Sequence, residues 1–198
     1  MVFFCEKMYF TCMPLWYNSK IPMKPKSRWQ AKEGANMRRR ERKVEDTKEI
    51  KRILDESKYL QLGLCDKDQP YVVPMNYGYV YEEGRLTFYL HGATEGYKYE
   101  LIAKNPKVAF ALECGVEPFE GKVACQYGMI YSSIMGKGMA HLITDVEEKK
   151  RALTLLMKAQ TGKDFTFNEE LVSIVNVIRI DVTEFEAKSR PLPPAMQK

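Results

Sequence analysis

The sequence of 198 residues contains only two histidines, His91 and His141, and neither has a carboxylate or cysteine at metal-ligand spacing. We therefore predict that the chain has no metal site. Its cysteines are odd in number, widely scattered and without a C-x-x-C pair, which predicts buried free thiols instead of disulfides or a redox couple. The five cysteines are Cys5, Cys12, Cys65, Cys114 and Cys125.

Long hydrophobic runs are also missing. No stretch approaches the roughly 20 apolar residues that a membrane span needs. The apolar start of the chain is interrupted by Glu6 and Lys7, and no small-residue cleavage site follows, so it does not fit a signal peptide. With unpaired cysteines, these features predict a non-secreted, cytoplasmic protein without a membrane partner.

Several motifs of common enzyme classes are absent. The sequence has no P-loop, no G-x-S-x-G of α/β-hydrolases and no G-x-G-x-x-G of Rossmann domains. These absences exclude the usual phosphate-binding loops and the common serine nucleophile, so any cofactor must be held in another way.

Positive charge is confined to the start of the chain. The net charge is +5, but residues 1–45 carry 11 Lys and Arg against 4 Glu, whereas residues 46–198 carry 20 basic against 22 acidic residues. The basic run "MRRRERK" at 37–43 could touch phosphates. Because the remainder has no basic excess, we expect a solvated terminus there and no nucleic-acid partner.

The chain divides into three parts. Residues 1–36 contain three prolines and show no periodicity, which predicts a poorly structured N-terminal extension. Met37 begins a stretch typical of a protein start, so one hypothesis is that residues 1–36 derive from an upstream start. Residues 37–191 form the predicted folded domain, and residues 192–198 a C-terminal tail.

The periodicity within the domain is mainly that of strands. Asp46 with Glu49 three residues later predicts the start of a first helix, and Gly162 the end of a later one. Pro74 requires a sheet edge or a bulge. We predict helices over 97–104 and 145–162, a loop over 115–122, and strands over 59–65, 71–82, 86–91, 107–114, 127–143 and 172–189. About six strands linked mainly by hairpins favour an antiparallel barrel with helices packed outside it.

One junction between a predicted strand and a predicted helix contains residues that could bind a ligand. The strand "LTFYLH" ends at His91, the Gly-containing turn "GATEG" follows, and a helix begins near Lys98. Exposed N–H groups at such a turn and helix start, with a lysine beside them, can capture a terminal phosphate. Glycine turns before helices are common, however, so a simple connection is the alternative.

Seven stretches in order resemble the pyridoxamine 5′-phosphate oxidase-like FMN-binding split barrels, and most closely the 5-nitroimidazole-resistance (Nim) proteins. They are "MRRRERKV", "QPYVVPMNYGY", "LTFYLHGATEGYK", "NPKVAF", "GKVACQYGMIYSSIMGKGMAHLI", "LLMKAQTGKDFTF" and "VIRIDVTEF". The resemblance spans Met37 to Pro191. It implies a mainly β fold with peripheral α-helices, namely a six-stranded antiparallel split β-barrel that forms a homodimer with FMN, or FAD, at the subunit interface.

The resemblance also implies the site residues. It places the flavin ring along the strand that contains Val73, Pro74, Met75 and Asn76, and the phosphate at Gly92, Gly96, Tyr97 and Lys98. His91 corresponds to the histidine beside flavin and substrate. Ser132 and Ser133 would come from the long bent strand, either of the same chain or of the second subunit of the dimer. Tyr97 departs from the family, which usually has arginine there, so phosphate binding would depend on Lys98 and backbone N–H groups.

Two functions from different classes follow from this resemblance. The first is an FMN-dependent oxidoreductase that reduces nitro compounds such as 5-nitroimidazoles, or another small electrophile, with NAD(P)H as a transient electron donor. The alternative is a flavin-binding carrier or sensor without turnover. A nucleic-acid-associated protein that uses "RRRERK" is a third, weaker hypothesis.

Overall fold

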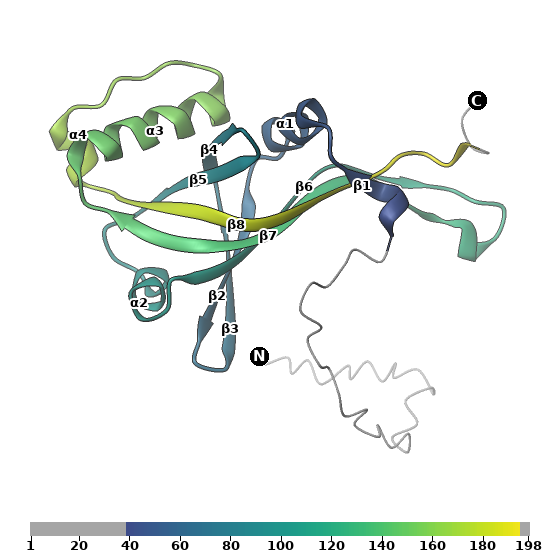
Figure 1. Ribbon diagram of the computed structural model, residues 1–198, viewed down its shortest axis with the longest axis horizontal. Coiled ribbons are helices and arrows are strands. Elements are labelled where there is room, and N and C mark those ends of the chain that lie inside the picture. The colour runs from purple at the N-terminus through teal and green to yellow at the C-terminus, as the bar shows by residue number, and fades with distance from the viewer. Residues whose placement is uncertain (1–38, 195–198) are drawn as a thin grey trace, which may run out of the picture. The chain divides into compact units, whose positions relative to one another are not determined.

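A computed structural model of the protein describes residues 39–194 (Figure 1). The predicted N-terminal extension and the last four residues of the predicted tail lie outside the described residues. Within them, no helix is long and apolar enough to cross a membrane.

The described part is built on one antiparallel sheet. Its order is β3-β2-β6-β7-β8-β5-β4, and β1 pairs with β8 outside this path. The strands are β1 (Lys43–Val44), β2 (Leu60–Asp66), β3 (Gln69–Met75), β4 (Tyr77–Glu82), β5 (Arg85–Gly92), β6 (Lys107–Phe119), β7 (Gly128–Ile143) and β8 (Asn176–Arg190). The predicted mainly β, antiparallel fold is confirmed, but the sheet has eight strands where the sequence predicted six.

The additional strands have two local causes. One is the two-residue β1. The other is a break at Asn76, which divides the predicted strand 71–82 into β3 and β4 at the two edges of the sheet. The Asn76 side-chain amide donates from Nδ2 to the Lys58 carbonyl at 3.0 Å and to Gln160 Oε1 at 3.3 Å. The sheet is therefore not closed by hydrogen bonds, and Pro74 lies on an edge strand as predicted.

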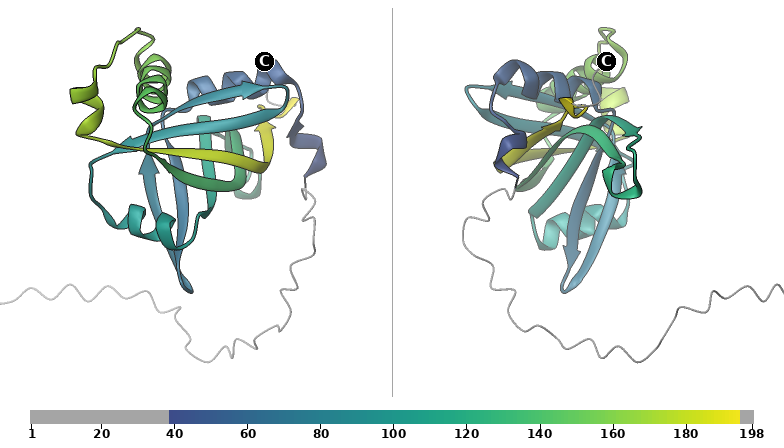
Figure 2. Two further views of the ribbon diagram at one scale, coloured as in Figure 1. Left: turned by 60° about the vertical axis from the view of Figure 1, so that its left-hand side comes forward. Right: turned by 90° about the vertical axis from the view of Figure 1, so that its right-hand side faces the viewer.

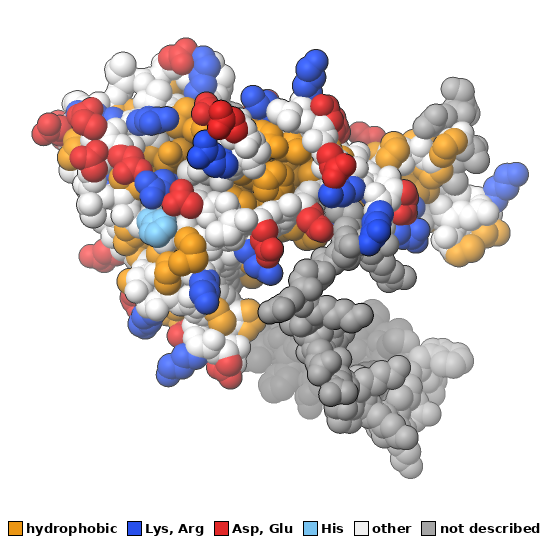
Figure 3. All heavy atoms as spheres, viewed as in Figure 1, with side chains coloured by type: hydrophobic (Ala, Val, Ile, Leu, Met, Phe, Trp, Pro, Cys, Tyr) orange, Lys and Arg blue, Asp and Glu red, His pale blue; other side chains and the backbone are white. Residues whose placement is uncertain are grey.

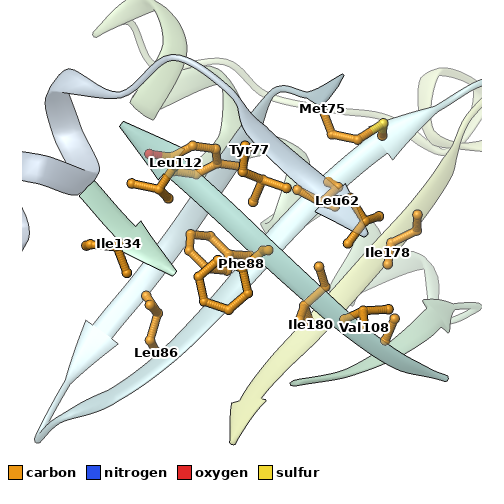
Figure 4. Packing of buried hydrophobic residues seen from close by; sticks show 14 of the residues in the cluster. Leu62, Met75, Tyr77, Leu86, Phe88, Val108, Leu112, Ile134, Ile178 and Ile180 are labelled. Atoms are coloured by element: carbon orange, nitrogen blue, oxygen red, sulfur yellow. The ribbon is translucent and has the colours of Figure 1, made fainter. Parts of the chain in front are cut away.

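The core fills the inside of the curved sheet, where Phe88 is fully buried (Figure 4). Edge-to-face contacts join its ring to Tyr77, with ring centroids 5.1 Å apart, and to Phe110 at 5.0 Å. The buried Tyr77 hydroxyl donates to the carbonyls of Leu54 and Ser57 at 2.7 and 3.1 Å. A tyrosine in this core thus also anchors the end of the first helix.

Helices cover the outside of the sheet. They are α1 (Thr47–Glu56), α2 (Tyr97–Lys104), α3 (Val146–Thr161) and α4 (Glu169–Ser173), with 3₁₀ turns η1 (Arg40–Arg42) and η2 (Ala124–Gln126). The helix starts follow local chemistry, since Asp46 accepts from Glu49 N at 3.1 Å and Asp145 from Glu148 N at 2.8 Å. Gly162 ends α3 at φ +71°. Figure 2 shows α2 beside the β2–β3 hairpin and α3 at the opposite end of the barrel.

Three further predictions need correction. Strand β6 continues to Phe119 through a register shift after Cys114, where a loop was predicted from residue 115. The last strand begins at Asn176 instead of residue 172, and residues 172 and 173 belong to α4, which Asn168 caps by accepting from Leu171 N at 2.9 Å. Cys65, Cys114 and Cys125 are free as predicted, but only Cys114 is buried.

Helix α3 packs directly on the backbone of β4 at Gly78. A Cβ atom added to Gly78 would lie 2.5 Å from Leu156 N and 2.6 Å from Leu156 Cα. These neighbours are helix backbone, so they cannot move aside by a rotamer change. Glycine at this position therefore sets how closely α3 approaches the sheet.

We expect Gly78→Ala to lower the free energy of unfolding by about 1–3 kcal/mol, because α3 must shift away from β4. Urea denaturation measures the change. Gly63→Ala is the matched control in β2, since its added Cβ would meet nothing closer than 3.4 Å. Equal effects of both substitutions would contradict the close packing at Gly78.

Candidate functional site

The junction predicted from sequence lies where β5 ends and α2 begins. His91 and Gly92 are the last residues of β5, paired with Val177 and Asn176 of β8. Gly96 precedes α2 with φ +150°, a conformation that favours glycine, and no side chain caps the helix start. The N–H groups of the first helical turn are therefore left without a side-chain cap.

Lys98 and Tyr99 converge on the backbone of Gly92. A Cβ atom added to Gly92 would lie 2.6 Å from the Tyr99 hydroxyl and 3.1 Å from Lys98 Nζ. The ammonium group also lies 4.5 Å from the centroid of the Tyr99 ring, a cation–π distance. Any side chain at position 92 would require the Tyr99 hydroxyl and the end of the Lys98 side chain to move from these positions.

The same junction holds buried polar atoms that have no partner. Within residues 39–194, three buried side-chain atoms make no hydrogen bond: Ser57 Oγ, His91 Nδ1 and the Tyr99 hydroxyl. An unsatisfied buried polar group costs about 1–3 kcal/mol. Two of the three lie within residues 91–99, which identifies this junction as a place where an additional polar partner would be accommodated.

The surroundings of His91 favour the neutral form of its imidazole. Burial, and then the nearby Lys98 charge, lower the pKa of His91 below its usual value. The unfolded chain therefore binds the proton of His91 more tightly than the folded chain does. The stability contributed by the neutral imidazole is present above pH of about 6.5 and is lost as the pH falls through the folded-state pKa.

Of the four residues predicted along the flavin ring, two face the core. Val73 packs against the core and Met75 is buried, whereas the side chains of Pro74 and Asn76 are exposed. Because β3 is an edge strand, one row of its backbone N–H and C=O groups is unpaired by the sheet. This strand therefore offers backbone groups for recognition.

The side chain of Tyr97 makes its contacts with other residues than Lys98 does. Its hydroxyl donates to Asp66 Oδ2 at the end of β2, and its ring meets that of Tyr71 edge to face, with centroids 5.4 Å apart and planes at 85°. The hydrogen bond to Asp66 raises the pKa of the phenol. Tyr97 thus connects α2 to the β2–β3 hairpin.

The structure does not bring the two predicted serines to this junction within one chain. Ser132 pairs with Ser189 of β8, whereas His91 pairs with Val177, 12 residues earlier. At about 3.3 Å per residue this separation is about 40 Å of strand. Ser132 is 6% exposed and accepts a hydrogen bond from Arg52 at 3.0 Å, while Ser133 lies on the other face of β7.

A cleft of about 550 Å³ lies between the ends of α1 and α3, away from this junction. Its polar groups already have partners. Tyr79 donates to Asp55 at 2.7 Å, Lys58 to the Asp55 carbonyl at 3.2 Å, and Lys158 to Asp164 at 2.7 Å. Size alone favours this cleft, but the unpartnered polar atoms favour the β5–α2 junction.

Comparison with known proteins supports the family expected from the sequence. Residues 46–189 match the pyridoxamine 5′-phosphate oxidase family. A candidate 5-nitroimidazole antibiotic resistance protein from Bacteroides thetaiotaomicron is 32% identical, with a TM-score of 0.63 over 74% of this chain and 85% of that one. The chain belongs to the pyridoxamine 5′-phosphate oxidase family. The split-barrel fold of the family is thereby confirmed for this chain.

More distant structures share the fold of this family member. A flavocytochrome from Azotobacter vinelandii is 20% identical, with a TM-score of 0.65 over 80% of this chain and 74% of that one. An FAD and heme binding protein from Mycobacterium smegmatis is 14% identical, with a TM-score of 0.64 over 77% and 75%. No curated protein matches the sequence.

Sequence reasoning about this family member missed Tyr99, Asp66 and Tyr71. Tyr99 follows Lys98 directly, but nothing in "GYKYE" indicates that its hydroxyl is buried against Gly92. Asp66 and Tyr71 lie about 30 residues before Tyr97, and only the packing of α2 on the β2–β3 hairpin brings them together. The one available signal was the tyrosine in place of the usual arginine.

We expect His91 to titrate below pH 6.5 in the folded protein, and Lys98→Met to raise its pKa partway, because the contribution of burial remains. Histidine NMR resonances followed against pH measure both values. With only two histidines in the chain, His141, which contacts Asp181, provides an internal reference signal. An unchanged His91 titration in Lys98→Met would show that the ammonium does not act on the imidazole.

Proposed function

We propose that this chain binds a flavin at the β5–α2 junction and acts as an FMN-dependent oxidoreductase. Its substrates would be small electrophiles, in particular nitro compounds such as 5-nitroimidazoles. The observation that carries the proposal is the convergence of Lys98, the Tyr99 hydroxyl and His91 at one unpartnered polar junction. The 32% identity to a candidate nitroimidazole resistance protein supports the choice of substrate.

The residues at the junction fit a flavin phosphate. Lys98 Nζ supplies a positive charge and the uncapped start of α2 supplies N–H donors, the combination that anions prefer. The edge of β3 could hold the polar rim of the flavin ring through backbone groups, beside Val73, Pro74, Met75 and Asn76. The phosphate contact of the flavin mononucleotide group is the same in FMN and FAD, so this fit holds for either.

A bound flavin supplies the redox chemistry, and the protein supplies position and protons. Two-electron reduction of a nitro group to a nitroso group consumes two protons and releases one water. NAD(P)H, bound transiently, would supply a hydride, that is, two electrons and one proton. His91 is half-buried, and its lowered pKa favours the neutral imidazole but makes the protonated form a stronger acid. Protonation of His91 from solvent, followed by donation to the substrate oxygen, would deliver the second proton.

We further infer a homodimer. Strand β7 exposes apolar side chains that one chain leaves uncovered: Met135 is 47% exposed and Met129 39%. Ser133 lies on the same face of β7 as Met135, about 40 Å along the sheet from His91 in its own chain. In a second copy packed on this face, Ser133 could reach the junction, whereas Ser132 remains engaged with Arg52.

Other partners receive less support. On the face seen in Figure 3, acidic and basic side chains alternate and form no basic field. Nucleic acid is therefore not proposed as a partner. The cytoplasmic location predicted from the sequence remains a prediction.

The visible spectrum of the purified protein tests flavin binding, and the flavin released on denaturation identifies the cofactor. Addition of NAD(P)H should bleach the bound flavin, and a 5-nitroimidazole should restore its colour. A flavin that bleaches but is not reoxidised by any nitro compound would refute the substrate class. A flavin that never bleaches would favour the carrier or sensor, and a colourless protein that cannot be reconstituted would refute flavin binding.

We expect Lys98→Ala to weaken flavin binding about 10- to 150-fold, as loss of a charge-assisted hydrogen bond to phosphate predicts. His91→Ala should leave binding within about threefold but slow flavin reoxidation by the nitro compound. Flavin dissociation constants and single-turnover reoxidation rates separate the two effects. Lys104→Ala, at the exposed end of the same helix, is the control for loss of one positive charge. Wild-type affinity in Lys98→Ala would place the phosphate elsewhere.

We expect light scattering to give twice the 23.0 kDa mass of one chain. Met135→Glu should lower the dimer fraction and the bound flavin together, because it introduces a charge beside Glu186 on the proposed interface. Leu142→Glu, at a residue of β7 that is 39% exposed near α3, is the matched control and should remain dimeric. A monomer that retains flavin would show that one subunit forms the site.

A further inference from the structure

Lys98 carries a positive charge that no carboxylate in the described part of the chain neutralises. The side chain is half-buried, and within residues 39–194 it forms no ion pair and no hydrogen bond. Its ammonium group lies 4.5 Å from the centroid of the Tyr99 ring, and Nζ lies 3.1 Å from the position that a Cβ atom of Gly92 would take. An anion at this place would therefore meet a cation that is partly desolvated and has no anionic partner.

His91 is the titratable group next to this cation. It precedes Gly92 on β5, and its Nδ1 atom is buried without a hydrogen-bond partner. In a protonated imidazole both ring nitrogens are donors, so a proton on Nδ1 would be buried without an acceptor. Burial, and then the charge of Lys98, also lower the pKa of His91. The chain by itself thus disfavours the imidazolium through burial, a like charge and a missing acceptor.

The other charged or titratable groups on the elements around His91 are uncharged, exposed to solvent or engaged elsewhere. Phenols are uncharged near neutral pH. The carboxylates and Lys163 are exposed. Arg179 donates to Glu148 at 2.9 Å, and Lys149 donates to a backbone carbonyl at 3.1 Å. These groups are Tyr89 on β5, Arg179 on β8, Glu95, Tyr99 and Glu100 on α2 and the turn before it, Lys149 on α3, and Lys163, Asp164, Glu169 and Glu170 on the loop after α3 and on α4. Lys98 is therefore the charge through which a ligand can act on His91.

An anion bound at Lys98 would reverse the electrostatic effect on His91. A phosphate monoester carries about −1.5 to −2 charges at pH 7, so a phosphate and one ammonium together have a net negative charge. A net negative charge nearby favours the imidazolium, and phosphate oxygens are acceptors for its N–H groups. One ligand would thus remove the like charge and the missing acceptor together, and only the effect of burial would remain.

We propose that binding of a phosphate group at Lys98 is coupled to the uptake of a proton by His91. The proposal deepens the proposed function and rests on it for the identity of the phosphate, that of a flavin. The proton comes from solvent, and His91 becomes the acid that the proposed reduction needs only while the phosphate is in place. Because the coupling is reciprocal, a lower pH should also tighten the binding of the anion.

Calorimetry of full-length, flavin-free protein with sulfate tests the coupling, because sulfate itself takes up no proton between about pH 5 and pH 7.5. Titrations near pH 6.5 in two buffers of different ionisation enthalpy give the number of protons taken up, which we expect to be about 0.3 to 0.8 per sulfate bound. The affinity for sulfate should rise about three- to tenfold from pH 7.5 to pH 6. The same titrations with FMN should show this uptake in addition to the titration of the FMN phosphate.

Two histidine variants assign the proton. His91→Gln should abolish the uptake with sulfate, and with FMN should leave only the protons of the phosphate. His141→Gln, at the second of the two histidines in the chain, is the matched control and should keep the wild-type uptake. Lys98→Met should weaken sulfate binding about tenfold or more. Histidine NMR resonances should show that the pKa of His91 rises when FMN binds, whereas the titration of His141 stays the same.

The outcomes separate the coupling from the function on which it rests. Binding without proton uptake, or an uptake that persists in His91→Gln or is lost in His141→Gln, would overturn the coupling and leave flavin binding intact. Where FMN binds and sulfate does not, the difference in uptake between wild type and His91→Gln decides in the same way. Uptake with sulfate in a protein that binds no flavin would support the coupling and refute the proposed function. Absence of binding by sulfate and by FMN would refute both.

Discussion

The close approach of α2 to the end of β5 at Gly92 is the contact on which the candidate site depends. Because this position has no side chain, the Tyr99 hydroxyl and Lys98 Nζ can lie against the strand backbone. That approach buries the hydroxyl and brings the ammonium charge near His91, where burial first and the charge second lower the pKa of the imidazole. One steric condition thus produces both the geometry and the electrostatics of the junction.

The β5–α2 junction is distinguished by polar groups that lack hydrogen-bond partners, and not by the size of a cavity. The cleft between α1 and α3 is large, but Asp55, Lys58 and Tyr79 satisfy one another there. A ligand entering that cleft would have to break these bonds before it formed its own. At the junction the partners are missing, so a phosphate or a flavin gains hydrogen bonds without such a loss.

The length of β7 and β8 is the reason for proposing that a second subunit contributes to the site. The two strands pair over most of their length and carry Ser133 about 40 Å of strand away from the region of His91. The exposed methionines of β7 lie on the same long strand. A second subunit would cover these side chains and complete the site in one step, which links oligomeric state to cofactor binding.

Local chemistry in the sequence by itself determined much of this structure. The caps Asp46 and Asp145, the stop at Gly162 and the strand-to-helix junction at 91–98 all depend on neighbours within a few residues. Pro74 lacks a backbone N–H, which restricted its strand to a sheet edge or a bulge. The seven stretches between Met37 and Pro191 that resemble the family in the same order also indicated the family, which the match over residues 46–189 confirmed.

Only the tertiary structure decided which side chains meet. Alternation along a strand leaves open which face is inside, so the sequence did not show that Ser132 is buried and accepts a hydrogen bond from Arg52. The break at Asn76, the contact of Tyr97 with Asp66 and the buried Tyr99 hydroxyl depend on residues 7 to 84 positions apart. Such contacts follow from sheet register and helix packing, which short-range patterns in a sequence do not encode.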